Sequence, residues 1–220
     1  SVAKDVRVII IKLADRLHNV ETLRYLDPEK RKKIAQETLT IHAPLAQKIG
    51  MNDLKWRLED ESFKHLMPDK FKMTKRLISQ KRSEREAATK NMISEIESFL
   101  EKNNLNAFVT GRPKSLFSVY NKLQRYKQMG RNFSDIEDLI AIRIVVKSKE
   151  ECYVALGKIH DLWRPIPGSF DDYIASPKEN YYQSLHTVVM NENNQKIEFQ
   201  IRSEKMHKFA EEGVASHWKY

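Results

Sequence analysis

Residues 138–147 read DLIAIRIVVK, and this almost continuous apolar run decides the fold. A strand that is apolar at nearly every position is covered on both faces, which predicts a central place in a sheet. Residues 196–202, KIEFQIR, alternate instead. One face carries Ile197, Phe199 and Ile201, and the other carries Lys196, Glu198, Gln200 and Arg202. This second pattern alone favours an ordinary strand with one solvated face.

Short apolar segments alternate with helical ones on either side of these strands. We expect a strand at 105–110, a helix at 113–129 and a helix at 149–163. Residues 184–190 and 196–202 are separated by the polar stretch NENNQ, which suits a hairpin loop. Ser203 can cap a final helix that extends to residue 217. The second half of the chain is therefore predicted to be α+β, with a mixed sheet flanked by helices.

The first third of the chain is predicted to be helical. Apolar residues recur with helical spacing at 6–26, at 30–49 and at 53–67, with a bend near Pro44. Residues 75–102 are highly charged and predict a partly solvated helix between two parts of the protein. A boundary between those parts is expected near residues 68–75.

Composition limits the classes of function that need to be considered. The chain has 220 residues, of which 40% are hydrophobic and 31% charged, and no apolar run approaches the ~20 residues of a membrane span. We expect a cytoplasmic piece of a longer protein. Cys152 is the single cysteine, and the seven histidines form no zinc motif, so a bound metal would need carboxylate ligands. The net charge of +9 predicts an anionic partner.

One segment, which contains a predicted helix, carries positive charge without acidic residues. Between Gly111 and Ser134 the sequence holds six Lys or Arg residues and no Asp or Glu. Pro113 suits a first helical position, where free N–H groups could face an anion. On the helix, Lys114, Ser118, Lys122 and Arg125 fall within roughly 80° of one another. A phosphate-binding face and an ordinary solvated face are both compatible with this pattern.

A short polar and aromatic loop, PKENYYQSLHT at 177–187, has the composition of a nucleotide-binding segment. Lys178 can meet a phosphate, and Tyr181 or Tyr182 can stack on a base. Three further side chains can hydrogen-bond polar edges, namely Asn180, Gln183 and His186. The alternative is a turn with packed tyrosines and a satisfied histidine.

Two carboxylates are candidates for phosphoryl chemistry. Asp138 begins one predicted strand and Glu198 lies in another. If the two strands are neighbours, the pair could hold a divalent cation and orient an attacking hydroxyl. Spacing alone does not establish that they are adjacent.

Longer stretches of the chain resemble the synthetase domain of the RelA/SpoT alarmone enzymes. The resemblance rests on GRPKSLFSVYNKL, DIEDLIAIRIVV, CYVALGKIHDLWRPIPGSFDDYIASPKENYYQSLHT and IEFQIRSEKMHKFAEEGVASHW, in this order, and covers residues 105–220. KLADRLHNVETL resembles the end of the family's HD-type hydrolase domain, and AQETLTIHAPLAQKIGMNDLKWRLEDESF its helical connector. The implied domains are a hydrolase remnant at 1–24, a connector at 25–74 and a synthetase domain at 75–220.

The resemblance implies transfer of pyrophosphate from ATP to the 3′ hydroxyl of GDP or GTP, giving ppGpp or pppGpp and AMP. It implies a sheet similar to that of nucleotidyltransferases, and Mg²⁺ as the cofactor. Asp138 would bind metal, and Glu198 would bind metal or activate the hydroxyl. The positions implied for phosphate binding are Arg112, Lys114, Ser118 and Lys122. Those implied for the guanine nucleotide are Tyr182, which would stack on the base, with Lys178, Asn180 and His186.

Some positions depart from the family pattern. Tyr181 stands where a glycine usually precedes the stacking tyrosine, which predicts a changed pocket entrance. The segment at 169–172, SFDD, resembles the acidic version found in synthetase-only members at Asp171, whereas Ser169 fits neither version. A magnesium-using enzyme in which synthesis dominates is therefore expected.

In the hydrolase remnant, the resemblance implies that Asp15 is a metal ligand and that Asn19 and Thr22 contact the nucleotide. The family's other metal ligands lie upstream, so no hydrolysis is expected from this chain, and Mn²⁺ would be needed only with a complete hydrolase domain. Ribosome or tRNA binding is expected only through regions outside the chain, and neither membrane nor DNA is expected as a partner. Two other functions stay open, a non-catalytic basic module that binds RNA or the ribosome and a phosphohydrolase fragment.

Overall fold

The computed structural model describes residues 5–111, 115–130 and 140–214, with the backbone alone at 80–88 and 140. The chain divides into two compact units. Unit 1 comprises the described parts of Ser1–Ile78, Ser115–Lys122 and Glu211–Tyr220, and unit 2 those of Ser79–Lys114 and Leu123–Ala210. The expected boundary at 68–75 lies inside a continuous helix, α5 (Pro68–Lys102), and the division between the units falls later in that helix.

Unit 1 is helical, as the sequence predicts. Its N-terminal elements are α1 (Val6–Glu21), a 3₁₀ turn η2 (Leu23–Tyr25), α2 (Pro28–Glu37), a π-helical turn η3 (Thr38–His42), α3 (Ala43–Lys48) and α4 (Asn52–Leu66). The expected bend near Pro44 takes the form of this π turn, in which the Ala43 amide donates to the Thr38 carbonyl five residues earlier. Leu13, Val20, Leu23 and Leu58 are fully buried in the core of the unit.

Unit 2 is built on a mixed six-stranded sheet. Its strands are β1 (Phe108–Gly111), β2 (Ile140–Val146), β3 (Arg164–Pro165), β4 (Asp171–Asp172), β5 (Leu185–Met190) and β6 (Lys196–Ser203). The order is β1-β2-β6-β5-β3, and β4 also pairs with β5. Among the strands that the structure describes, only the β2–β6 pair is parallel. The predicted central position of residues 138–147 is therefore confirmed for β2, and the predicted hairpin between β5 and β6 is confirmed as well.

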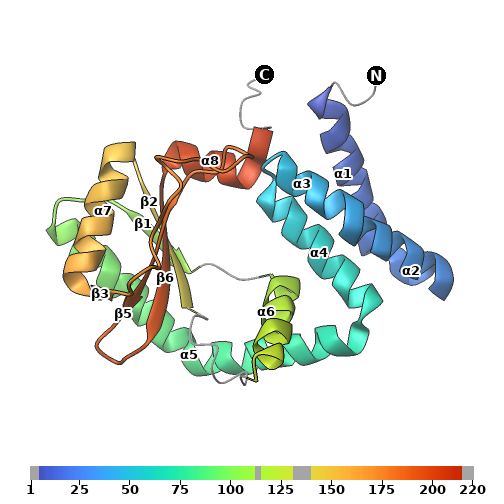
Figure 1. Ribbon diagram of the computed structural model, residues 1–220, viewed down its shortest axis with the longest axis horizontal. Helices are drawn as coiled ribbons and strands as arrows, with labels where there is room; N and C mark the ends of the chain where they lie inside the picture. Colours follow the sequence, from blue (N-terminus) through green and yellow to red (C-terminus); the bar gives the residue numbers. More distant parts are fainter. Residues whose placement is uncertain (1–4, 112–114, 131–139, 215–220) are drawn as a thin grey trace. The chain divides into compact units, whose positions relative to one another are not determined.

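One face of this sheet forms the apolar core of unit 2. Ile142 and Ile144 of β2 and Phe199 and Ile201 of β6 are fully buried there. Helix α7 (Lys149–Leu162) lies beside the strands (Figure 1), and its Ile159 belongs to the same cluster, as do three residues of α5, Met92, Ile96 and Leu100. Ser148 accepts a hydrogen bond from the Glu151 amide and so caps α7. The core holds β2 and β6 rigidly together.

The opposite face of β6 is not the solvated surface that the alternating pattern predicts. Gln200 and Arg202 are each only 2% exposed, and Glu198 is half-buried. The expectation of an ordinary half-solvated strand is therefore wrong for these residues. Because buried polar groups need hydrogen-bond partners, this face must carry an organised polar network.

Two helices, α6 and α8, are shorter than predicted. α6 spans Leu116–Gln128, and α8 spans Glu204–Glu212, where the Ser203 hydroxyl accepts a hydrogen bond from the Met206 amide in the predicted cap. α8 stops before Gly213, whose φ of +61° lies in the left-handed region that ends many helices. None of the helices that the structure describes combines the length and apolar character needed to cross a membrane.

Candidate active site

A row of polar residues crosses the sheet of unit 2 from strand to strand. The strand registers pair Thr110 with Arg143, Arg143 with Gln200, Gln200 with His186, and His186 with Asp171. Directly opposed residues of neighbouring strands point their side chains to the same face. Five strands thus place polar or charged groups side by side on the face opposite the apolar core, which is the arrangement expected of a binding site on a sheet.

Glu198 lies two residues before Gln200 on β6, and therefore on the same face of the sheet. It is paired with Ala141 on β2 and with Val188 on β5, and its Oε1 accepts a hydrogen bond of 3.3 Å from Gln200 Nε2. Strands β2 and β6 are direct neighbours, as the carboxylate hypothesis requires. Asp138, the other member of the proposed pair, lies outside the described residues.

The loop before β5 folds into a compact aromatic cluster. Tyr182 Oη and His186 Nε2 are hydrogen-bonded at 2.9 Å, and the Tyr173 ring contacts both rings edge-on, with centroids 6.4 Å and 5.2 Å away. Lys178 Nζ lies 4.1 Å from the Tyr173 ring centroid and 5.5 Å from that of Tyr182. Asn180 Oδ1 accepts from the Tyr182 amide at 3.3 Å. The four residues predicted for the guanine nucleotide therefore lie together.

This cluster is electrostatically mixed. Burial raises the pKa of Tyr173, and the neighbouring Asp171 carboxylate raises it further. Lys178 supplies a cation above the rings, an arrangement that aromatic faces favour. The packed-turn alternative describes the hydrogen bonds within the loop correctly, since His186 does have a partner. It does not account for a lysine and an aspartate gathered around the same rings.

Tyr181, which stands where the resemblance implies a glycine, has an exposed side chain. Its φ is +60° and its side chain is 73% exposed. A non-glycine residue in this region is strained, because Cβ crowds the backbone. The position thus needs a left-handed backbone, which explains why glycine suits it, and the ring is accommodated in solvent.

The N-terminus of α6 is occupied by side chains of its own unit, which corrects one expectation. Asp60 of α4 accepts from the Ser115 hydroxyl at 2.9 Å, from the Leu116 amide at 3.2 Å and from the Phe117 amide at 2.9 Å. Ser115 Oγ accepts from the Ser118 amide at 3.3 Å. The prediction that these N–H groups face a bound anion is therefore wrong, because a carboxylate from the protein already satisfies them.

The predicted phosphate-binding face is described only in part. Ser118 is exposed on α6, Lys122 is half-buried, and Val119 on the other side of the helix is buried. Arg112 and Lys114 lie outside the described residues. The role of this face in phosphate binding stays a prediction.

The three residues of the predicted hydrolase remnant lie along α1. Asn19 Nδ2 donates to Asp15 Oδ2 at 3.0 Å, and both side chains are exposed. Thr22 ends the helix, and its hydroxyl donates to the His18 carbonyl at 3.0 Å. The structure therefore brings Asp15 and Asn19 together and uses Thr22 in a helix cap.

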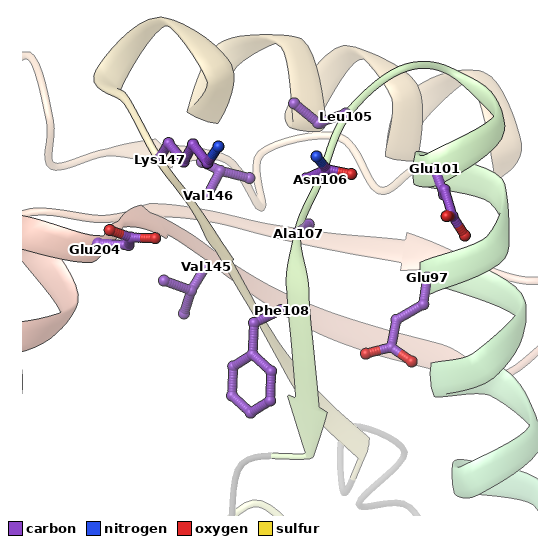
Figure 2. A pocket seen from close by; sticks show the side chains of 10 residues that line it. All are labelled: Glu97, Glu101, Leu105, Asn106, Ala107, Phe108, Val145, Val146, Lys147 and Glu204. Carbon is purple, nitrogen blue, oxygen red and sulfur yellow. The ribbon is translucent and has the colours of Figure 1, made fainter.

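A pocket of about 620 Å³ lies elsewhere in unit 2 and contains none of the predicted site residues. Figure 2 shows it beside the C-terminal end of β2, with Glu97 and Glu101 on one side and Glu204 on the other. Lys147 is the one basic residue among those that line it. Three glutamates would repel a nucleotide phosphate, so we place the candidate site at the polar row and not in this pocket.

Sequence reasoning missed three residues of the site, namely Arg143, Tyr173 and Arg202. Arg143 and Arg202 are charged residues inside predicted strands, and the alternation of KIEFQIR assigned Arg202 to solvent. Only the burial of this face, with Arg202 Nη2 donating to Gln200 Oε1 at 3.0 Å, reveals that it belongs to the network.

The fit of a divalent cation can be judged from the donor set. No group of three or more His, Cys, Asp or Glu suited to a metal occurs among the residues for which coordinates are described. Glu198 offers carboxylate oxygens, the donors that Mg²⁺ prefers, and Mg²⁺ is commonly held by one or two carboxylates together with substrate phosphates. Glu198 thus fits a magnesium ion that the substrate helps to hold.

Comparisons with known proteins place these features in context. The family model described as "Region found in RelA / SpoT proteins" matches residues 111–220, and one described as "HD domain" matches residues 1–52. A GTP pyrophosphokinase of Streptomyces antibioticus is 49% identical over 220 residues, which are all of this chain and 26% of that protein. The bifunctional (p)ppGpp synthase/hydrolase RelA of Mycobacterium tuberculosis is 44% identical over 220 residues, or 29% of its length.

Solved structures show weaker likeness. The small alarmone synthetase 1 of Bacillus subtilis, bound to its product pppGpp, is 23% identical, with 63% of this chain and 79% of that chain covered and a TM-score of 0.45. A GTP pyrophosphokinase family protein of Streptococcus pneumoniae is 22% identical, with 60% and 72% covered and a TM-score of 0.47. The present chain spans only about a quarter of the curated relatives' length. Because the first family model covers half of the sequence, the chain belongs to the RelA/SpoT family.

Proposed function

We propose that this chain transfers pyrophosphate from ATP to the 3′ hydroxyl of GDP or GTP, producing ppGpp or pppGpp and AMP. The observation that carries the proposal is one polar face of the sheet. This face holds the aromatic and cationic cluster that includes Tyr182 and Lys178, and it also holds the half-buried carboxylate of Glu198. Relatives named GTP pyrophosphokinase, at 49% and 48% identity over the full chain, support the same reaction. ATP and guanine nucleotides are cytoplasmic metabolites, so we place the chain in the cytoplasm.

The acceptor nucleotide binds at the aromatic cluster in this proposal. Tyr182 stacks on guanine, an interaction that contributes roughly 1–3 kcal/mol per base. Lys178 meets the phosphates, while Asn180 and His186 hydrogen-bond polar groups of the nucleotide. The existing contact between Tyr182 and His186 holds the ring ready for the base, which reduces the entropy lost on binding.

The reaction itself takes place near Glu198. The acceptor 3′ oxygen attacks the β-phosphorus of ATP, the bond from that phosphorus to the α–β bridging oxygen breaks, and AMP leaves with that oxygen. Glu198 orients the hydroxyl and accepts its proton. Glu198 and Asp138 would hold Mg²⁺, which supplies positive charge to the phosphates when bound. Arg112, Lys114, Ser118 and Lys122 are assigned to the ATP phosphates.

The proposal is tested by incubating the chain with labelled ATP and GDP, with and without Mg²⁺, and separating the products. We expect AMP and ppGpp in equal amounts, and only with Mg²⁺. Tyr182→Ala should raise the KM for GDP roughly 5- to 150-fold, the equivalent of one lost stacking contact. Glu198→Gln should abolish turnover and leave GDP binding within about threefold of wild type.

Two results would contradict the proposal. If the wild-type chain forms no AMP, the proposed reaction is wrong. If Tyr182→Ala and Glu198→Gln lose GDP affinity equally, the roles assigned to these two residues are wrong.

The net charge of +9 also favours a second candidate function, that of an RNA-binding module. Tight RNA binding that weakens steeply with salt, together with no AMP release, would establish that candidate instead. Breakdown of ppGpp with Mn²⁺, read in the same separation, would identify a hydrolase fragment.

A further inference from the structure

A chain of hydrogen bonds connects the tyrosine of the candidate acceptor site to the carboxylate of the candidate reaction site. Arg202 Nη2 donates to Tyr182 Oη at 3.3 Å and to Gln200 Oε1 at 3.0 Å, and Gln200 Nε2 donates to Glu198 Oε1 at 3.3 Å. Glu198, Gln200 and Arg202 alternate along β6, so they lie on one face of the strand. The two functional groups are thus connected through only two intermediate side chains.

The chemistry of these side chains fixes the direction of the chain. Arginine has only donors, so the Gln200 oxygen must face Arg202. The Gln200 amide nitrogen then faces Glu198, whose carboxylate can only accept when ionised. Reversing the amide would set nitrogen against a guanidinium donor and oxygen against a carboxylate oxygen. Arg202 therefore determines which end of the Gln200 amide faces Glu198.

The position of Arg202 is unusual for its residue type. Arg202 is only 2% exposed, and its guanidinium carbon lies 5.4 Å from the centroid of the Tyr182 ring. Burying a charged group is costly unless its donors are used. An arginine that served only to fill space would be replaced at lower cost by an apolar residue. The Nη2 group of Arg202 donates both to Tyr182 Oη and to Gln200 Oε1, so the guanidinium is held between these two side chains.

We propose that Arg202 is a positioning residue that aligns the acceptor nucleotide with the reacting carboxylate, through Tyr182 on one side and Gln200 on the other. The inference rests on the proposed function, because it assigns Tyr182 to the base and Glu198 to the 3′ hydroxyl. The two arms act on different quantities. The Tyr182 arm affects acceptor binding, and the Gln200 arm affects the chemical step.

Three variants separate the arms in steady-state assays of AMP formation. Arg202→Met keeps much of the side-chain volume and removes both arms, so kcat should fall about 10- to 100-fold, as for other supports of reactive groups, and the KM for GDP should rise several-fold. Gln200→Leu removes one arm, so kcat should fall by a similar factor while the KM for GDP stays within about twofold. Arg202→Lys, which keeps the charge, should restore activity in part.

A double-mutant cycle decides whether Arg202 acts through Gln200. If it does, the kcat of the Arg202→Met and Gln200→Leu double variant should lie within about threefold of the lower single variant, because the second change removes a link already broken. The KM for ATP should not change in any variant. The proposal would be overturned if the loss of kcat in the double variant equalled the product of the losses in the two single variants. It would also be overturned if the KM for GDP rose equally in both single variants.

A measurement without substrate distinguishes failure of this inference from failure of the proposed function. In NMR spectra of the intact chain, the Gln200 side-chain amide protons should exchange slowly with solvent in wild type and rapidly in Arg202→Met. Wild-type thermal stability in Arg202→Lys serves as the folding control. Unchanged exchange in Arg202→Met would overturn the positioning role whether or not the chain makes ppGpp. Altered exchange with an inactive wild type would support the network and refute only the reaction.

Discussion

Single residues with unusual surroundings explain much of what is specific to this chain. Asp60 is an example, because its carboxylate accepts three hydrogen bonds at the start of a helix more than fifty residues later in the sequence. The apolar side of that helix contacts α4 through Phe63, whose ring centroid lies 5.5 Å from that of Phe117 and 4.8 Å from that of Tyr120. Asp60 therefore fixes the start of α6, and Phe63 packs against the part of this helix that belongs to unit 1.

Asp60→Ala should lower the free energy of unfolding by about 1–2 kcal/mol, because the cap hydrogen bonds are lost. Asp60→Asn should cost less, since one oxygen acceptor stays. Urea denaturation at neutral pH measures both. Asp161→Ala is the matched control, because Asp161 has a side chain that is 70% exposed and lies 3.7 Å from Lys158. Equal midpoints for Asp60→Ala and Asp161→Ala would show that the cap does not stabilise the helix.

Tyr181 offers a second test at the scale of one residue. Its left-handed backbone costs roughly 1–2 kcal/mol for a residue with a Cβ, whereas glycine adds roughly 0.5–1 kcal/mol of entropy loss. Tyr181→Gly should therefore raise the free energy of unfolding by up to about 1 kcal/mol. Tyr181→Ala removes the ring and keeps the strain, so it should change stability little. A gain in the alanine variant equal to that in the glycine variant would assign the effect to the exposed ring.

At the scale of elements, two glycines of the chain have different roles. Gly157 lies inside a helix, where other residues would fit, whereas Gly213 follows the end of a helix, where the backbone conformation favours glycine. Gly157 lies in the middle of α7, and a Cβ there would meet nothing within 4 Å. Gly213 follows α8 with φ +61°, and a Cβ there would lie 2.5 Å from the Ile49 carbonyl oxygen and 2.8 Å from the Met51 amide nitrogen. The Val214 amide donates to the same Ile49 carbonyl at 3.1 Å, so backbone meets backbone within unit 1.

The two glycine-to-alanine changes should have opposite signs. Gly157→Ala should raise the free energy of unfolding by roughly 0.5–1 kcal/mol, because alanine loses less backbone entropy in a helix. Gly213→Ala should lower it by roughly 1–3 kcal/mol, through left-handed strain and crowding. Thermal unfolding followed by circular dichroism gives both values. A neutral Gly213→Ala would mean that this contact does not persist in solution.

At the scale of the whole molecule, three half-buried histidines link stability to pH. Burial lowers the pKa of His42 and His65 in unit 1, and it lowers the pKa of His160 in unit 2 despite the opposing charge of Asp161. The folded state thus favours neutral imidazoles, whereas the unfolded chain takes up protons near the ordinary value of 6.5. Stability is therefore present above that value and is lost as the pH falls through it.

His160→Gln should make stability less dependent on pH between about 7.5 and about 5.5, a window that covers the ordinary histidine pKa. As the pH falls across this window, the free energy of unfolding should decrease more in the wild-type chain than in the variant. The substitution also removes the imidazole that lies 2.9 Å from the Thr187 hydroxyl. Burial also raises the pKa of Glu59, which acts in the opposite direction, but this effect is common to both proteins and cancels in the difference. A steeper dependence in the variant would contradict the assignment.

The sequence by itself determined the elements and the chemistry that they could carry. The continuous apolar run predicted a central place for β2, and the alternation of KIEFQIR predicted which residues share a face of β6. The polar stretch before residue 196 predicted the hairpin. These are local consequences of side-chain periodicity, which is why they could be predicted. The grouping of Tyr182, Lys178, Asn180 and His186 was also predicted correctly, because they are near neighbours in the chain.

Only the tertiary structure decided which polar groups are buried and what they contact. The parallel pairing of β2 with β6 brings together segments more than fifty residues apart, and no local pattern specifies that register. Arg202 has the sequence signature of a solvated strand residue, yet it is almost fully buried beneath Tyr182. Asp60 has the sequence signature of an exposed helical residue, yet its carboxylate caps α6. Burial depends on what packs against a face, and that is set by the whole chain.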